Sequence, residues 1–257
     1  MGGLFHKLRN PRRCYVVCAI ARSGSNLFTD GLHATRRAGR PKQFFLPKYE
    51  HQYAAKSGLD ANDFAGYVRG IIPATATSNE VFGFKLMGWY LEEFLGRLRE
   101  TRAFGGGHLD EDLEMLRNAF PQLRFIQIVR HNKVRQAVSK ARAAQTGLWK
   151  IQEGNSASGE ARFDPDLIAN CLEDTRREEL IWTRFFDRIG VQPFLVKYED
   201  LSADYAGTIA AVLKFLRIRA PRRSRLRPVT IRQTDILSQE WEERFLTLPA
   251  PNEPISF

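Results

Sequence analysis

The amino-acid sequence predicts an α/β protein in which a mostly parallel central sheet is flanked by helices in three layers. Short apolar runs of strand length alternate along the chain with longer segments of helical periodicity. The 257 residues show no internal repeat, and this length suits one large α/β domain with a sizeable core. Each predicted element follows from its local pattern, as described below in chain order.

The first predicted strand is the apolar run over residues 15–21, which stops at Arg22. The small residues of the sequence SGSN follow, and apolar residues then return at helical spacing. This pattern predicts a buried strand, a tight turn and the beginning of a helix. A simple connection between two elements does not need an arginine and two hydroxyls at this point.

The elements predicted in the middle of the chain are a strand over 81–87, a helix over 89–104, a helix over 109–120, a strand over 124–130 and a helix over 134–145. Three glycines follow the first of these helices, and acidic residues occupy the first turn of the second, where the helix dipole favours them. The residues between 48 and 80 have a less regular pattern, and we interpret them as an insertion on the substrate side.

The last third of the chain begins with a flexible polar loop over 154–160. After this loop, the sequence predicts a helix over 165–190, a strand over 193–198 and a helix over 202–218, with Ser202 as the N-cap of the last helix. The basic run over 219–228 is interpreted as a solvated loop rather than a dedicated anion site. These elements predict one domain over 14–245, preceded by a basic tail (1–13) and followed by a C-terminal tail (246–257).

The charge of the chain favours an anionic partner. Lys plus Arg number 39 and Asp plus Glu number 29, which gives a net charge of +10. The three cysteines, Cys14, Cys18 and Cys171, complete no metal-binding motif, and we expect them to be buried thiols in a reducing compartment. The sequence contains no secretory signal and no run that could span a membrane, so we expect a cytoplasmic protein.

The loop after the first strand has the composition of a phosphate-binding loop. Backbone N–H groups at a helix N-terminus point outward without partners, and Gly24 allows a ligand to approach the backbone closely. Ser23, Ser25 and Asn26 add side-chain donors, and Arg22 adds a fixed planar charge. The loop matches neither the GxxxxGK[ST] nor the GxGxxG motif, so by itself it is only a moderate indication of anion binding.

A second stretch, IQIVRHNKVRQAVSKARA, supports the same interpretation. Arg130 follows a predicted strand, at the edge where open α/β sheets bind their ligands. Ser139 lies on the following helix, and the two side chains together could hold a second phosphate. The alternative is a surface arginine and an ordinary polar residue on a helix.

These residues resemble those of the sulfotransferases that use 3′-phosphoadenylyl sulfate (PAPS), which have a P-loop-like fold. Within this class the chain resembles the bacterial trehalose 2-sulfotransferase group and its lipopolysaccharide and nodulation-factor relatives. The resemblance extends from residue 15 to about residue 245. Besides RSGS and the Arg…Ser pair, it includes GRPKQFF (39–45), GFKLM (83–87), RQAVSKARAAQTGLW (135–149), VKYEDL (196–201) and RQTD (232–235).

The resemblance implies a role for each matched position. Arg22 to Leu27 would surround the 5′-phosphosulfate, Arg130 and Ser139 would bind the 3′-phosphate, and Arg232 and Gln233 would close over the nucleotide. The reaction would be in-line transfer of a sulfuryl group to an acceptor hydroxyl, catalysed by positioning and cationic donors without a metal. The resemblance also suggests a homodimer. A polyanionic nucleotide accounts for the basic charge, so we expect no nucleic-acid partner.

The sequence departs from the family pattern at the acceptor. In the trehalose enzymes the stretch matching GRPKQFF carries a carboxylate just before the two phenylalanines, and this carboxylate is thought to be the base. Here Gln43 occupies that position, and Arg40 replaces a matching glutamate. An amide can orient a hydroxyl but cannot take its proton. Among nearby titratable residues, Glu50 is the alternative that we consider further; the others are His51, His33 and Asp30.

Two other functions remain open from the sequence. The chain could be a PAPS- or PAP-binding protein of the same fold with altered catalysis, which the presence of Gln43 would explain. Less favoured is a nucleotide phosphotransferase with an atypical phosphate loop, because the sequence lacks a Walker lysine and an obvious magnesium-binding carboxylate after a strand.

Overall fold

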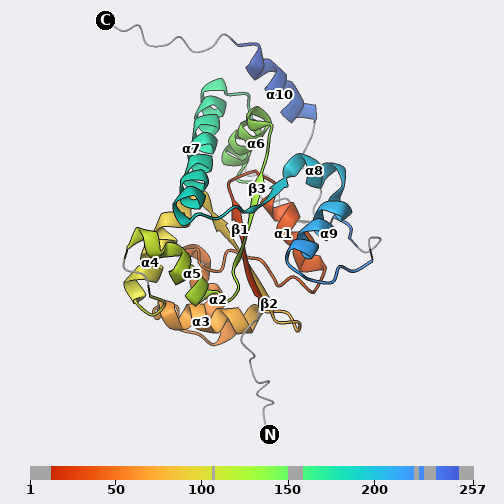
Figure 1. Ribbon diagram of the computed structural model, residues 1–257. Coiled ribbons are helices and arrows are strands. Elements are labelled where there is room, and N and C mark those ends of the chain that lie inside the picture. The colour runs from red at the N-terminus through yellow and green to blue at the C-terminus, as the bar shows by residue number, and fades with distance from the viewer. Residues whose placement is uncertain (1–12, 106–107, 150–158, 223–225, 229–235, 249–257) are drawn as a thin grey trace, which may run out of the picture. The chain divides into compact units, whose positions relative to one another are not determined.

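The computed structural model describes residues 13–105, 108–149, 159–222, 226–228 and 236–248. It contains a four-stranded sheet in the order β2-β1-β3-β4, in which every neighbouring pair is parallel (Figure 1). The strands are β1 (Arg13–Ala19), β2 (Val81–Met87), β3 (Arg124–Val129) and β4 (Phe194–Lys197). The predicted α/β class with a parallel sheet is confirmed, and the carboxyl ends of all four strands lie along one edge.

Strand β1 is buried on both faces, as expected for the centre of a parallel sheet. Its alternate residues enter two different cores: Cys14, Val16 and Cys18 pack on one face, and Tyr15 and Val17 on the other. All three cysteines are buried free thiols, and burial raises the pKa of Cys14 to about 12. Within the described residues, no group of His, Cys, Asp and Glu could hold a metal ion.

One face of the sheet is covered by α2 (Pro47–Ser57), α3 (Phe64–Thr75), α4 (Leu91–Thr101) and α5 (Asp112–Ala119), with short 3-10 turns η1 (Gly88–Tyr90) and η2 (Leu109–Glu111). The region 48–80, whose sequence pattern is less regular, contains most of α2 and the whole of α3, and its interpretation as an insertion on the substrate side stays a prediction. The termini of these helices have local causes: Pro47 occupies the first turn of α2, and the side chain of Asp63 caps α3 by accepting the N–H of Gly66. The apolar face of α3 then joins the core.

The opposite face carries α1 (Ser25–Ala34), α8 (Tyr198–Ala203) and α9 (Tyr205–Phe215). The single helix predicted over 202–218 is therefore wrong in its first residues, and Ser202 is not its N-cap. Asp204 interrupts the helix with a non-helical backbone (φ −131°, ψ 79°) and caps α9, because its Oδ1 accepts the N–H of Gly207 at 2.9 Å. Serine and aspartate are both good N-caps, and the aspartate caps α9 because the backbone leaves the helical conformation at this residue.

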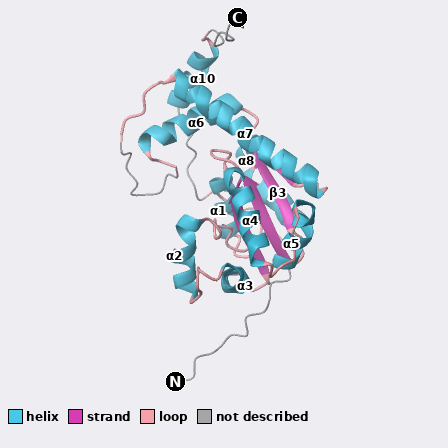
Figure 2. Cartoon of the chain, turned by 90° about the vertical axis from the view of Figure 1, so that its left-hand side faces the viewer, coloured by secondary structure: helices cyan, strands magenta, loops and turns pink. Residues whose placement is uncertain are grey.

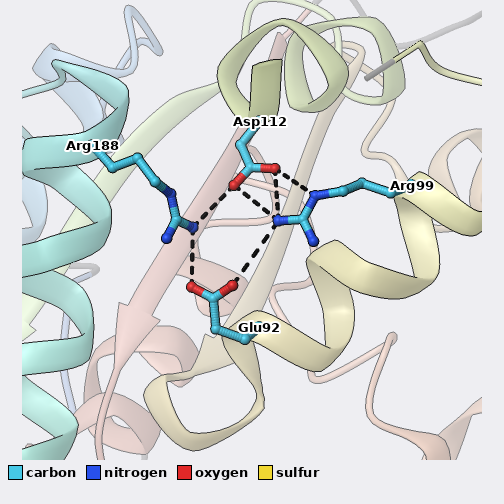
Figure 3. A network of polar contacts seen from close by, with 4 residues as sticks. All are labelled: Glu92, Arg99, Asp112 and Arg188. Atoms are coloured by element: carbon cyan, nitrogen blue, oxygen red, sulfur yellow. Dashed lines mark hydrogen bonds and ion pairs between the residues drawn. The ribbon is translucent and has the colours of Figure 1, made fainter. Parts of the chain in front are cut away.

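A buried carboxylate connects α4, α5 and the C-terminal part of α7 (Pro165–Ile189). Asp112 is fully buried, and Figure 3 shows it between two arginines. Arg99 donates to both of its oxygens at 2.9 and 3.1 Å, and Arg188 donates to Oδ2 at 2.9 Å. Arg188 also contacts Glu92 at 3.0 Å, so the network fixes three helices through one acid.

The chain divides into two compact units, Met1–His131 with Glu178–Val229 and Asn132–Arg177 with Thr230–Phe257. The sheet belongs to the first. The second unit contains α6 (Lys133–Thr146), the first part of α7 and α10 (Ile236–Leu246) (Figure 2). Of these three helices, only α10 was not predicted from the sequence. Its small core includes Val138, Ile168 and Trp241. The expected single domain over 14–245, with its two tails, stays a prediction.

The other expected elements agree with the structure to within a few residues, apart from two stretches. The polar loop over 154–160 lies mostly outside the described residues. The described parts of the basic run 219–228 contain no helix or strand. No helix in the described part of the chain has the length and apolar character needed to cross a bilayer.

Candidate active site

The loop that leaves the carboxyl end of β1 is held in an unusual backbone conformation. Arg22 has a φ of 60° and Gly24 a φ of 86°, both in the left-handed region. A non-glycine residue in this region costs of order 1–3 kcal/mol, and such residues often occur at binding sites. The buried Ser23 hydroxyl donates to the carbonyl of Ile20 at 2.9 Å and closes the turn. The loop is therefore a fixed element that leads directly into α1.

The N-terminus of α1 fits an anion. Its N-cap is Gly24, which has no side chain to accept the N–H groups of the first turn. These groups carry the positive end of the helix dipole, equivalent to roughly half an elementary charge. The carbonyl of Gly24 already accepts the N–H of Phe28 at 3.1 Å, so the helix begins at the loop without any intervening residue.

Lys85 is a component of the site that sequence reasoning missed. It lies on the buried strand β2 and is only 7% exposed, and its Nζ donates to Oδ1 of Asn26 at 2.6 Å. A buried ammonium beside the positive end of a helix is electrostatically unfavourable. An anion bound at the start of α1 would reverse this cost. A single lysine inside the apolar sequence VFGFKLM was the available signal.

Arg130 reaches the same loop from the end of β3. Its guanidinium is buried and stacks 4.6 Å from the ring centre of Tyr198, the first residue of α8, and its Nη1 lies 3.5 Å from the carbonyl oxygen of Arg22. The Tyr198 ring also lies against the loop, since a Cβ on Gly24 would be 2.3 Å from its Cδ2. Tyr198 thus connects the two arginine-bearing loops, and only glycine fits beneath it.

The segment after Arg130 is fixed by a charged side chain. Both carboxylate oxygens of Glu199 accept the N–H of His131, at 3.0 and 3.1 Å. Glu199 follows Tyr198 in the sequence VKYEDL, so one short motif both supports the arginine and orients the loop that carries it.

Three further residues were predicted to bind the nucleotide together with Arg130: Ser139, Arg232 and Gln233. Ser139 is a half-buried residue of α6, in the second unit. Arg232 and Gln233 lie outside the described residues. The pairing of Arg130 with Ser139 and the closing role of Arg232 and Gln233 therefore stay predictions.

Gln43 lies beside β2, close in sequence to a backbone contact with Lys85. The N–H of Lys85 donates to the carbonyl of Lys42 at 2.9 Å, and Lys42 forms a parallel bridge with Phe84. Phe44 and Phe45 are buried in the aromatic core and anchor the segment from its other side. Gln43 is half-buried between these two anchors. Lys85 thus contacts the Gln43 segment through its backbone and the β1–α1 loop through its side chain.

The carboxylate of Glu50 is paired, which does not favour a role as a base. Both of its oxygens accept from Arg97, at 2.7 and 2.8 Å, and Arg97 also donates to the hydroxyl of Tyr90 at 2.8 Å. Glu50 is 4% exposed, and this arrangement is typical of a buried structural ion pair. A catalytic role for Glu50 stays a prediction, but its geometry supports the structural alternative.

The other titratable residues near Gln43 in the sequence offer no better base. Asp30 lies 3.6 Å from the ammonium of Lys42, and His51 is exposed on α2. Partial burial, followed by the charges of Lys42 and Arg40, lowers the pKa of His33 and so favours its neutral form. His33 lies in the last turn of α1, however, roughly 12 Å from the N-terminus of this helix at 1.5 Å per residue.

Comparisons with known proteins identify the family of the chain. The model of the Stf0 sulphotransferase family matches residues 14–247. Trehalose 2-sulfotransferase of Mycolicibacterium smegmatis is 29% identical over 253 residues, which cover 90% of this chain and 93% of that protein. Trehalose 2-sulfotransferase of Mycobacterium tuberculosis is 28% identical over 261 residues, which cover 91% of this chain and 94% of that protein.

Solved structures of sulfotransferases also match. The sulfotransferase domain of the Synechococcus PCC 7002 olefin synthase is 14% identical with a TM-score of 0.46, covering 95% of this chain and 91% of that chain. Sulfotransferase STF9 from Mycobacterium avium is 12% identical with a TM-score of 0.47, and the match covers 85% of this chain and 67% of that chain. Because the family model matches nearly the whole chain, this protein belongs to the Stf0 sulphotransferase family.

Proposed function

We propose that this sulfotransferase transfers a sulfuryl group from PAPS to a hydroxyl of a carbohydrate or glycolipid. The observation that carries the proposal is the position of Lys85. Its side chain contacts Asn26 in the first turn of α1, and its backbone contacts the segment of Gln43. One buried cation therefore joins the loop suited to the donor anion with the segment that in the trehalose enzymes carries the presumed base.

The residues present fit a nucleotide with several negative charges. The loop Arg22–Leu27, with Lys85, would hold the 5′-phosphosulfate, and Arg130, stacked on Tyr198, would hold the 3′-phosphate together with Ser139. Arg232 and Gln233 would close the site. When bound, PAPS supplies the activated sulfuryl group. The chain then has to place an acceptor oxygen in line with the sulfur and stabilise the charge on the departing phosphate oxygen.

Gln43 would orient the acceptor hydroxyl without accepting its proton. A loose transition state demands little of the nucleophile, so the proton can leave late, to the transferred group or to water. The printed names of the relatives, which specify trehalose, support a carbohydrate acceptor. The loss of the carboxylate before the two phenylalanines is a reason to test other sugars as well.

The experiment is a transfer assay with ³⁵S-labelled PAPS against a panel of sugars and glycolipids that includes trehalose. We expect label in at least one acceptor, and a sharp loss of transfer in Arg22→Ala. Calorimetry with PAP, PAPS and ATP accompanies the assay. Binding of PAP without transfer to any acceptor would indicate a binding protein, and preference for ATP over PAPS would indicate a phosphotransferase; either result overturns the proposal.

Restoring the carboxylate tests the acceptor site. General-base catalysis typically contributes about 10²–10⁴-fold, so Gln43→Glu is expected to raise turnover with the best acceptor if the site is otherwise conventional. The control is Glu50→Gln, which removes the paired carboxylate without emptying its position. A gain in Gln43→Glu with no loss of rate in Glu50→Gln supports an orienting glutamine. A large rate loss in Glu50→Gln, with folding intact, assigns the base to Glu50 instead.

The compartment and the oligomeric state belong to the same proposal. Three buried free thiols suit a reducing compartment, which supports the cytoplasm. The homodimer rests on the family resemblance, and light scattering of the full chain tests it: a monomer at all concentrations would exclude it.

A further inference from the structure

Three arginines gather at the edge of the sheet opposite the candidate active site. Arg13 is the first residue of β1 and Arg124 the first residue of β3, so both lie where strands begin. Arg217 follows the C-terminus of α9 with a φ of 56°. Nη1 of Arg13 donates to the carbonyl of Arg217 at 2.5 Å, and Nη1 of Arg124 donates to the carbonyl of Phe215. We refer to these three residues as the arginine cluster.

The cluster carries three positive charges close together. Among the described ion pairs, none involves Arg13, Arg124 or Arg217. The pKa of Arg124 is lowered by burial and then by the charges of Arg217 and Arg13, which shows that the guanidinium groups are close enough to repel one another. The C-terminus of α9 contributes the equivalent of roughly half a negative charge, against three full positive charges.

Helix capping explains only part of this arrangement. Arginine side chains commonly donate to the last carbonyls of a helix, as Arg124 does to Phe215, whereas Arg13 donates to the carbonyl of Arg217, two residues beyond the end of α9. One guanidinium would be enough for this purpose, and each has five N–H donors, of which a carbonyl contact uses one. Two half-buried arginines and one exposed one at the same helix end therefore exceed what capping requires.

Basic residues continue from the cluster along the sequence. Arg219 and Arg222 follow Arg217 and are exposed. Planar guanidinium groups match the geometry of tetrahedral oxyanions and bind them through paired charge-assisted hydrogen bonds. We propose that the arginine cluster binds a phosphate-type oxyanion, either a free phosphate or the headgroup of an anionic lipid, at a site separate from the catalytic one.

The experiment compares the wild type with the triple variant Arg13→Gln/Arg124→Gln/Arg217→Gln. Glutamine keeps an N–H donor and a long polar side chain at each position, while the charge is removed. The matched control is Arg176→Gln/Arg177→Gln/Arg184→Gln, which removes the same charge from exposed positions on α7. Binding of pyrophosphate is measured by calorimetry at low ionic strength. Binding to phosphatidylcholine vesicles with and without phosphatidic acid is measured by flotation.

We expect the triple variant to lose at least about tenfold in affinity for one of the two probes, and the control to keep it. Loss of pyrophosphate binding alone identifies a free phosphate as the ligand, and loss of binding to acidic vesicles identifies the headgroup. Equal binding by the triple variant and the control overturns the proposal and leaves the cluster as a helix cap. If the triple variant does not fold, the exposed Arg217→Gln substitution alone is tested, with a severalfold loss expected.

Discussion

The Lys85→Met variant is expected to transfer sulfate about 10²–10³-fold more slowly than the wild type, which is the typical cost of removing one preorganised donor. The ammonium of Lys85 reaches the first turn of α1 from a strand that otherwise carries apolar residues into the core. Methionine fills a similar volume without the charge. The substitution therefore removes the electrostatic contribution at the donor site and leaves the packing of β2 in place.

A second measurement separates this catalytic role from a structural one. Burying a charge costs free energy that a bound anion offsets, so the free energy of unfolding of the Lys85→Met apoprotein is expected to stay within about 1 kcal/mol of wild type or to rise. The control is Lys56→Met, an exposed lysine in the last turn of α2, which should alter neither quantity. A Lys85→Met variant with wild-type turnover and wild-type affinity for PAP would remove Lys85 from the site.

Asp112→Ala is expected to lower the free energy of unfolding by about 3–5 kcal/mol, the usual cost of removing one partner from a buried ion pair. The alanine would leave Arg99 and Arg188 facing one another with Glu92 as the remaining acid of the network (Figure 3). Urea unfolding followed by circular dichroism measures the change.

The control for this prediction is Glu92→Ala within the same network. The side chain of Glu92 is 54% exposed, so its ion pairs are screened by water and should contribute about 1 kcal/mol or less. Equal losses of unfolding free energy in Asp112→Ala and Glu92→Ala would mean that the burial of Asp112 does not determine its contribution to stability. The kinetic parameters of folded Asp112→Ala should stay close to wild type, because its partners lie on α4 and α7 rather than in the β1–α1 loop.

The sequence indicated the central sheet because each strand has a local signal. An apolar run that ends at small or charged residues has the length of a buried strand, and a parallel sheet places the ends of such runs on one edge. For this reason the segment at Arg22 and the position of Arg130 after a strand could be predicted. The two helices within 48–80 could not, because their pattern is weak and packing against the core decides them. The break at Asp204 likewise depends on a backbone conformation that local propensity does not specify.

By itself, then, the sequence determined the class of the fold, the loop at the start of α1 and the arginine that follows β3, since all three depend on residues adjacent along the chain. Only the tertiary structure decided which distant side chains reach that loop. Lys85 meets Asn26 across 59 positions, and Tyr198 covers Gly24 from the end of β4. Such contacts follow from the order and register of the parallel strands. The local sequence around a residue does not specify this register, so it cannot indicate which distant side chain will be its neighbour.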